Sequence, residues 1–171
     1  MLSIPRILLV DMNSFFASVE QQANPFLRGK VVGVCASLHE TSCLIATSKE
    51  AKALGIKTGT LTYKAKKIYP KIVLLQAEPE KYREVNRRLV KIFRDYTDRV
   101  EVYSIDEAFL QFPISNFKFL ISIGAEIKKR IRQEVGEWLT CSVGIAPNKF
   151  MAKLAADMQK PDGLSIIWGR E

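Results

Sequence analysis

Two adjacent acidic residues, Asp106 and Glu107, lie within a run of strand-forming residues at positions 103–109. Burying a carboxylate without a partner costs several kcal/mol or raises its pKa until the group becomes neutral. An acidic pair at the turn of a hairpin therefore needs a partner, and a divalent cation is one candidate. The alternative is a solvated turn that happens to be acidic, and these seven residues alone favour neither interpretation.

A third carboxylate follows the first strand expected in the chain. Residues 7–10 form a short continuous apolar run, which is typical of a strand buried on both faces, and Asp11 comes directly after it. In a ferredoxin-like sheet this strand is a neighbour of the acidic hairpin, so the three carboxylates are expected to converge at one end of the sheet. Two unit charges about 4 Å apart repel by roughly 4 kcal/mol at an effective dielectric constant near 20.

The types of these side chains indicate which cation would relieve that repulsion. Oxygen ligands without His or Cys favour a hard cation, for which Mg²⁺ is the physiological default. Such a site usually completes its coordination with substrate phosphates and water, as in two-metal phosphoryl or nucleotidyl transfer. The alternative for Asp11 alone is a strand-end or capping aspartate.

Apolar periodicity predicts the elements that position these residues. Short apolar runs predict strands at residues 31–35, 44–46, 72–75, 139–145 and 163–168, with the acidic hairpin at 100–112. Apolar side chains at helical spacing predict long amphipathic helices at residues 79–96 and 116–135. Shorter helices are expected after Asn13, around residues 50–53, at 63–69 and after Asn148, with both asparagines as N-caps.

This order of elements predicts an α+β fold. Strand, long excursion, helix, hairpin, helix and strand match a ferredoxin-like βαββαβ arrangement with a small α/β subdomain inserted after the first strand. The two long helices are expected to cover the buried face of the sheet.

Composition indicates a globular protein whose charge favours an anionic partner, although many basic proteins bind neither nucleic acid nor membranes. The chain has 171 residues, of which 47% are hydrophobic, and a net charge of +8 favours nucleic acid or a membrane surface as partner. No apolar run is long enough to cross a membrane, and residues 1–6 lack a secretory pattern. The thiols of Cys35, Cys43 and Cys141 lack metal-site spacing and are expected to be reduced, as in a cytoplasmic protein, and His39 is expected at the surface.

Four sequence blocks, at residues 11–20, 103–109, 142–149 and 160–163, resemble the signature blocks of Y-family translesion DNA polymerases of the ImpB/MucB/SamB type. The resemblance extends over essentially the whole chain. It implies a catalytic palm, residues 1–13 and 75–171, with a fingers subdomain, residues 14–74, inserted into it. The thumb and little-finger domains of the family are expected to be absent, so the chain would correspond to the N-terminal palm and fingers portion.

The resemblance also implies roles for individual residues. Asp11, Asp106 and Glu107 match the family's catalytic metal-binding carboxylates, and the backbone carbonyl of Met12 matches a further metal ligand. The implied cofactor is a pair of Mg²⁺ ions, for which Mn²⁺ is an expected substitute.

The residues that the resemblance assigns to the incoming nucleotide are Phe15, Phe16, Lys49, Lys52 and Lys160. Phe16 matches the steric gate, which would abut the sugar C2′ and exclude a ribose hydroxyl. Its alternative is a core helix phenylalanine, the role expected of Phe15. The lysines would make charge-assisted contacts to phosphate, and their alternative is a solvated surface charge. Lys49 replaces a tyrosine that is common in the family.

The implied function is template-directed translesion DNA synthesis, in which a dNMP is transferred from a dNTP to the 3′-hydroxyl of a primer-template DNA. A sliding clamp is a further expected partner, through regions outside this chain, and no membrane is involved. The alternative is a non-catalytic nucleic-acid-binding or scaffolding module that kept the palm shape. Its support is the short chain and Lys49, whereas the three retained carboxylates argue against it. A nucleotidyl cyclase shares the palm plan, but that family's motifs are missing here.

Overall fold

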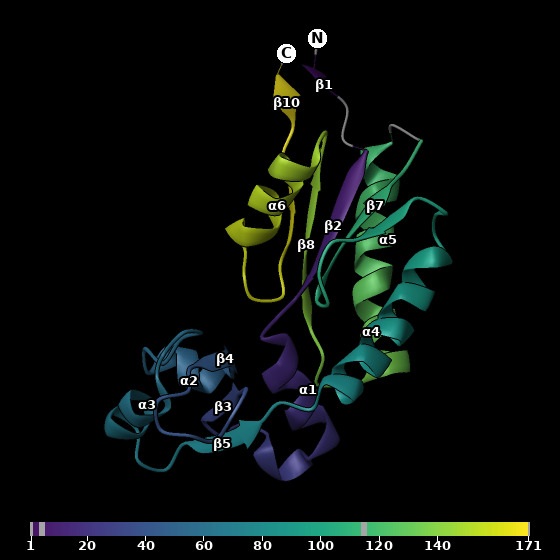
Figure 1. Cartoon of the computed structure of the whole chain (residues 1–171). Helices are drawn as coiled ribbons and strands as arrows, with labels where there is room; N and C mark the ends of the chain where they lie inside the picture. The colour runs from purple at the N-terminus through teal and green to yellow at the C-terminus, as the bar shows by residue number, and fades with distance from the viewer. Residues whose placement is uncertain (1, 4–5, 114–115, 171) are drawn as a thin grey trace. The chain divides into compact units, whose positions relative to one another are not determined.

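The computed structural model describes residues 2–3, 6–113 and 116–170. The chain forms two compact units, Met1–Asn13 with Arg83–Glu171, and Ser14–Tyr82. We call the first the sheet unit and the second the inserted unit (Figure 1). The predicted insertion, residues 14–74, ends earlier than the second unit does, and the names palm and fingers remain a prediction.

A five-stranded sheet forms the centre of the sheet unit. Its order in space is β6-β7-β2-β8-β9, with the bounds β2 (Ile7–Met12), β6 (Val100–Val102), β7 (Glu107–Gln111), β8 (Cys141–Ala146) and β9 (Leu164–Ile166). Strand β2 pairs antiparallel with both β7 and β8, and β9 is parallel to β8. The first four of these strands in the chain therefore have the ferredoxin-like order, and the α+β prediction is confirmed. Separately, β1 (Leu2–Ser3) pairs with β10 (Gly169–Arg170).

Helices pack on both faces of this sheet. They are α4 (Pro79–Arg94), α5 (Phe117–Arg130), its π-helical continuation η2 (Ile131–Val135), and α6 (Lys149–Met158). In β2, Ile7 and Leu9 share a core cluster with residues of α6, whereas Leu8 is directed toward Gly124 of α5. Figure 1 shows α6 on one side of β2 and α5 on the other. Burial on both faces explains the continuous apolar run that predicted this strand.

Helix α6 lies unusually close to β8 at Gly144. A Cβ atom on this glycine would lie 1.9 Å from the carbonyl oxygen of Ala152 and 2.4 Å from the backbone nitrogen of Ala156. Any other residue would therefore force the helix away from the sheet. The glycine thus allows the short distance between α6 and the sheet, and this distance determines where the lysines of α6 lie.

The inserted unit is a small α/β structure of its own. Its sheet has the order β4-β3-β5, formed by β3 (Val32–Cys35), β4 (Leu44–Thr47) and β5 (Val73–Gln76). Its helices are α1 (Phe15–Ala23), η1 (Pro25–Leu27), α2 (Lys49–Ala53) and α3 (Thr62–Ile68). A separate core cluster holds it together, made of Cys35, Leu44, Ala51, Ile56, Ala65 and Ile72.

The two predicted asparagine caps have different outcomes. Asn148 caps α6 by accepting a hydrogen bond from the Met151 N–H at 2.9 Å, which confirms that prediction. The prediction that Asn13 caps α1 was wrong, because the N-cap position is Ser14. The Asn13 amide instead donates to the Thr140 hydroxyl at 3.1 Å and accepts from the Ser142 hydroxyl at 3.0 Å. These distant partners hold Asn13 in the sheet unit.

The remaining composition-based predictions concern thiols, the histidine and membrane spans. All three cysteines are free, and burial raises the pKa of the Cys141 thiol to about 12. His39 is exposed, as predicted. Among the residues that the structure describes, no helix is both long enough and apolar enough to span a membrane.

Candidate active site

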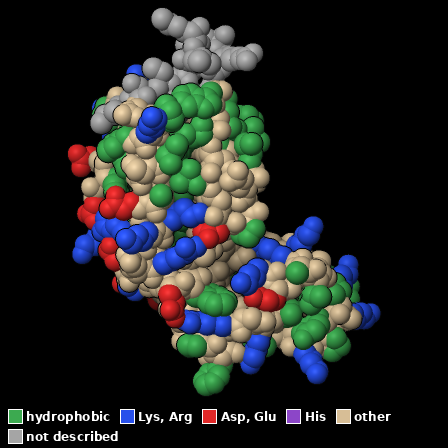
Figure 2. Space-filling view, turned by 180° about the vertical axis from the view of Figure 1, so that it is seen from behind, with side chains coloured by type: hydrophobic (Ala, Val, Ile, Leu, Met, Phe, Trp, Pro, Cys, Tyr) green, Lys and Arg blue, Asp and Glu red, His purple; other side chains and the backbone are tan. Residues whose placement is uncertain are grey.

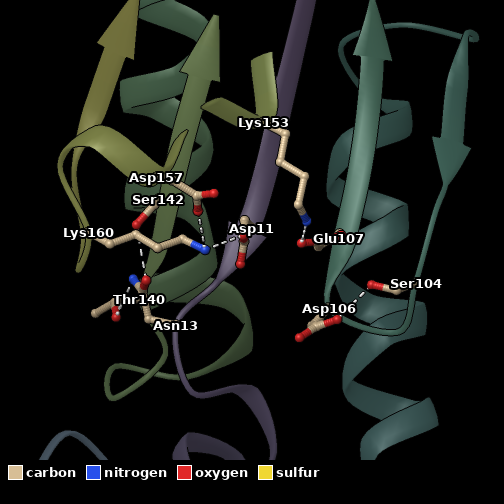
Figure 3. Close-up of polar contacts among 10 residues, drawn as sticks. All are labelled: Asp11, Asn13, Ser104, Asp106, Glu107, Thr140, Ser142, Lys153, Asp157 and Lys160. Carbon is tan, nitrogen blue, oxygen red and sulfur yellow. Dashed lines mark hydrogen bonds and ion pairs between the residues drawn. The ribbon is translucent and has the colours of Figure 1, made fainter. Parts of the chain in front are cut away.

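The pairing of β2 with β7 brings the predicted acidic residues to the same end of the sheet. Asp11 lies directly opposite Glu107 in the register of these strands. Asp106 immediately precedes β7, and its carbonyl oxygen accepts a hydrogen bond from the Met12 N–H at 2.9 Å. The predicted adjacency of the first strand and the acidic hairpin is therefore confirmed (Figure 3).

Asp11 is buried and paired with a lysine. The residue as a whole is only 5% exposed. One carboxylate oxygen accepts a hydrogen bond from the Lys160 ammonium at 2.5 Å. Lys160 also contacts the Asp157 carboxylate at 2.8 Å, so this ammonium bridges two acidic groups.

The other two carboxylates have partners of their own. Glu107 forms an ion pair with Lys153 of α6, and Asp106 accepts a hydrogen bond from the Ser104 hydroxyl at 2.6 Å. Figure 3 shows the three carboxylates directed toward these separate partners.

The electrostatics of Asp11 are those of a carboxylate among like charges. Burial raises the pKa of Asp11, the Lys160 ammonium opposes this, and the charges of Glu107 and Asp106 raise the pKa further. Burial lowers the pKa of Lys160, but its hydrogen bonds to Asp11 and Asp157 outweigh that effect and leave the pKa above its ordinary value. Lysine pairing therefore reduces the cost of the acidic cluster without removing it.

The oxygen ligands of this acidic cluster suit a hard divalent cation, but the carboxylates do not converge on one point. Across residues 2–3, 6–113 and 116–170, no three His, Cys, Asp or Glu side chains are placed to hold a metal ion together. Asp11, Asp106, Glu107 and the Met12 carbonyl offer only oxygen atoms, which suit Mg²⁺. To share one ion, the carboxylates would have to exchange their lysine and serine partners for the metal.

The remaining predicted site residues, apart from Lys160, belong to the inserted unit. Phe15 is 4% exposed, as a core phenylalanine would be. Phe16 is half-buried, and its ring centroid lies 4.4 Å from that of Tyr82. Lys49 and Lys52 are both exposed residues of the short helix α2.

Sequence reasoning did not single out Ser104 or Lys153. Ser104 lies only two residues before Asp106 in the sequence, so its nearness to that carboxylate was a local signal. Lys153 is 46 positions from Glu107, so only the fold reveals that pair. In the sequence, Lys153 could be recognised only as a basic residue of the helix predicted after Asn148.

Comparison with known proteins identifies the family of this chain. Residues 10–157 match the impB/mucB/samB family. The chain belongs to this family. It is 43% identical over 166 residues to the DNA polymerase IV of Pelotomaculum thermopropionicum, a match that covers 94% of this chain and 40% of that protein.

Solved structures of this family have the same fold. A Y-family DNA polymerase chimera aligns with a TM-score of 0.89 at 34% identity, over 94% of this chain and 48% of that one. DinB from Sulfolobus solfataricus aligns with a TM-score of 0.88 at 34% identity, again over 94% and 48%. The Y-family resemblance is therefore confirmed, and the chain spans 40% of the Pelotomaculum protein and 48% of the DNA polymerase IV of Metallosphaera sedula.

Proposed function

We propose that this chain is the catalytic core of a template-directed translesion DNA polymerase. The observation that supports this most strongly is Asp11 lying opposite Glu107, with Asp106 adjacent, in a chain of the impB/mucB/samB family. The reaction would transfer a dNMP to a primer 3′-hydroxyl without a protein nucleophile. The chain's contribution would then be positioning and stabilisation of charge.

Asp11, Asp106, Glu107 and the Met12 carbonyl would hold two Mg²⁺ ions, or Mn²⁺ in their place. Bound ions would assist deprotonation of the 3′-hydroxyl and neutralise charge on the pyrophosphate leaving group. Lys160, whose ammonium now bridges two carboxylates, would contact the nucleotide phosphates through charge-assisted hydrogen bonds.

The inserted unit would supply further contacts to the nucleotide. Phe16 would act as the steric gate against the ribose 2′-hydroxyl, with Phe15 supporting it from the core. Their ring centroids lie 5.6 Å apart. Lys49 and Lys52 would contact the triphosphate, where Lys49 provides a mobile point charge in place of a planar aromatic ring.

Primer-template DNA is the proposed macromolecular partner, with dNTP as the second substrate, and the cytoplasm as the site of action. The net charge of +8 favours such a polyanion, and Figure 2 shows many Lys and Arg side chains on the face that it displays. A sliding clamp would act through regions outside this chain.

Primer extension in Mg²⁺ tests this proposal. Wild-type protein should extend a primer at low salt, where phosphate contacts are strongest. Asp106→Ala should lower the rate about a thousandfold, the scale seen when a group that stabilises developing charge is lost. Glu84→Ala is the control, because the ion pair of Glu84 with Arg87 joins two well-exposed side chains. Equal extension by wild type and Asp106→Ala would contradict the mechanism.

The gate assignment has its own test. Phe16→Ala should raise ribonucleotide incorporation relative to deoxyribonucleotide incorporation, because the proposed steric barrier is removed. Phe26→Ala is the control, since that phenylalanine of the same unit is 83% exposed. An unchanged ratio in Phe16→Ala would reject the gate.

The second candidate is a nucleic-acid-binding or scaffolding module without catalysis. The separate pairing of each carboxylate favours it, as does Lys49. Such a module should show no thermal stabilisation by Mg²⁺ or Mn²⁺ in the presence of a nucleoside triphosphate, whereas the polymerase core should show it.

A further inference from the structure

Two of the three acidic side chains are already neutralised by ammonium groups of the same chain. Lys160 contacts Asp11 at 2.5 Å, and Lys153 contacts Glu107. The family resemblance gives Lys160 a role toward phosphate but gives Lys153 none. Lys153 therefore needs its own explanation.

We propose that Lys153 is an internal counterion of Glu107, which a divalent cation must displace in order to bind. This inference rests on the proposed metal-binding role of the carboxylates. The Glu107 side chain is only 14% exposed and lies opposite Asp11 across the two strands. Without a cation these carboxylates would repel each other, so the ammonium stabilises the metal-free site. The ammonium and the metal thus compete for the same carboxylate.

The surroundings of Lys153 allow it to leave. Its side chain is 45% exposed. It lines a groove of about 510 Å³ whose other lining residues are Tyr103, Phe109, Lys149, Phe150, Leu154 and Asp157. A displaced ammonium can therefore enter solvent within this groove instead of being buried.

Asp157 offers the displaced ammonium a second partner. It lies four residues after Lys153 on α6, the spacing at which helical side chains of opposite charge interact. It already contacts Lys160 at 2.8 Å. Rotation of its side chain would therefore bring the Lys153 ammonium from Glu107 toward Asp157.

Competition of this kind has two effects of opposite sign. Removing the ammonium should tighten metal binding, because the competitor for Glu107 is lost. It should also destabilise the metal-free protein, because the carboxylates are left unneutralised. A lysine with only a structural role would produce the second effect without the first.

The test measures Mn²⁺ binding through the electron paramagnetic resonance signal of free Mn²⁺. Lys153→Met, which keeps an apolar stem, should bind Mn²⁺ about fivefold more tightly than wild type. Lys149→Met is the matched control. It removes the same charge from the same helix one turn earlier, where Lys149 pairs with Glu101 at 2.5 Å, and its affinity should stay within about twofold of wild type.

A second readout uses thermal unfolding. In EDTA, Lys153→Met should unfold at a lower temperature than wild type, and saturating Mn²⁺ should reduce that difference. Equal Mn²⁺ affinity of Lys153→Met and wild type, or equal tightening in Lys149→Met, would overturn the inference while leaving the proposed function intact. Absence of saturable Mn²⁺ binding in all three proteins would instead contradict the proposed metal site, and this inference with it.

Discussion

Each of the two units contains a buried carboxylate, and the two differ in their neighbours. Glu20 in the inserted unit is 6% exposed, and Asp11 in the sheet unit is 5% exposed. Glu20 accepts hydrogen bonds from the Tyr82 hydroxyl and the Lys81 ammonium, both at 2.8 Å. Asp11 has one ammonium partner and two further carboxylates that raise its pKa. Burial alone is therefore not a reason to propose a functional carboxylate, whereas burial among like charges is one.

The surroundings of Glu20 are consistent with a structural role. Burial and the hydrogen bond to Glu20 raise the pKa of Tyr82 well above its ordinary value, so the phenol stays a hydrogen-bond donor. Lys81 also contacts Glu78 at 3.0 Å, which completes a small network within this unit. Each oxygen of the Glu20 carboxylate has a donor.

The largest effect expected from testing the comparison of Glu20 with Asp11 is a loss of stability when Glu20 is removed. Glu20→Ala should lower the free energy of unfolding by about 3 kcal/mol, because it leaves the buried Tyr82 hydroxyl without its acceptor and removes one of the two carboxylates that pair with Lys81. Urea unfolding followed by circular dichroism measures this loss.

Glu84→Ala is the control for that experiment. Its ion pair with Arg87 joins two well-exposed side chains, and exposed pairs contribute less than about 1 kcal/mol. Losses of equal size in Glu20→Ala and Glu84→Ala would contradict the structural role of the Glu20 network.

A smaller effect of opposite sign is expected at Asp11. Its pKa is raised above the ordinary 3.8 in the folded protein, so the folded state holds this proton more tightly than the unfolded state. Stability is therefore lost as the pH rises from 3.8 through the raised pKa. Asp11→Asn should avoid that loss and stabilise the metal-free protein at pH 7 by about 1 kcal/mol.

Urea unfolding in EDTA at pH 4 and pH 7 measures the Asp11 effect. The advantage of Asp11→Asn over wild type should be greater at pH 7 than at pH 4. A variant that is less stable than wild type at pH 7 would show that the Lys160 ion pair outweighs the burial and repulsion of Asp11.

Sequence patterns predicted the fold well because its signals are local. The apolar run at residues 7–10 identified β2, and Asn148 identified the start of α6. The hairpin was expected at residues 100–112 and contains β6 and β7. Asn13 was misassigned because its amide bonds to Thr140 and Ser142, more than 120 positions away. No local pattern encodes such partners.

The sequence predicted which acidic residues form the candidate site, but it did not predict which side chains pair with them. The acidic triad could be named from residue type and expected strand order. The lysine partner of Glu107 could not, because that contact depends on how closely α6 approaches β8 at Gly144. Glu20 was missed for the same reason, since its partner Tyr82 is 62 positions away.

Primer extension by Asp11→Asn and Glu20→Gln, measured beside their unfolding free energies, tests the central claim most directly. Gln keeps an acceptor for the Tyr82 hydroxyl, so Glu20→Gln should be less stable than wild type yet extend primers in Mg²⁺. Asp11→Asn should be more stable in EDTA and yet fail to extend primers. Retained extension by a folded Asp11→Asn would contradict the assignment of this acidic cluster as the catalytic centre.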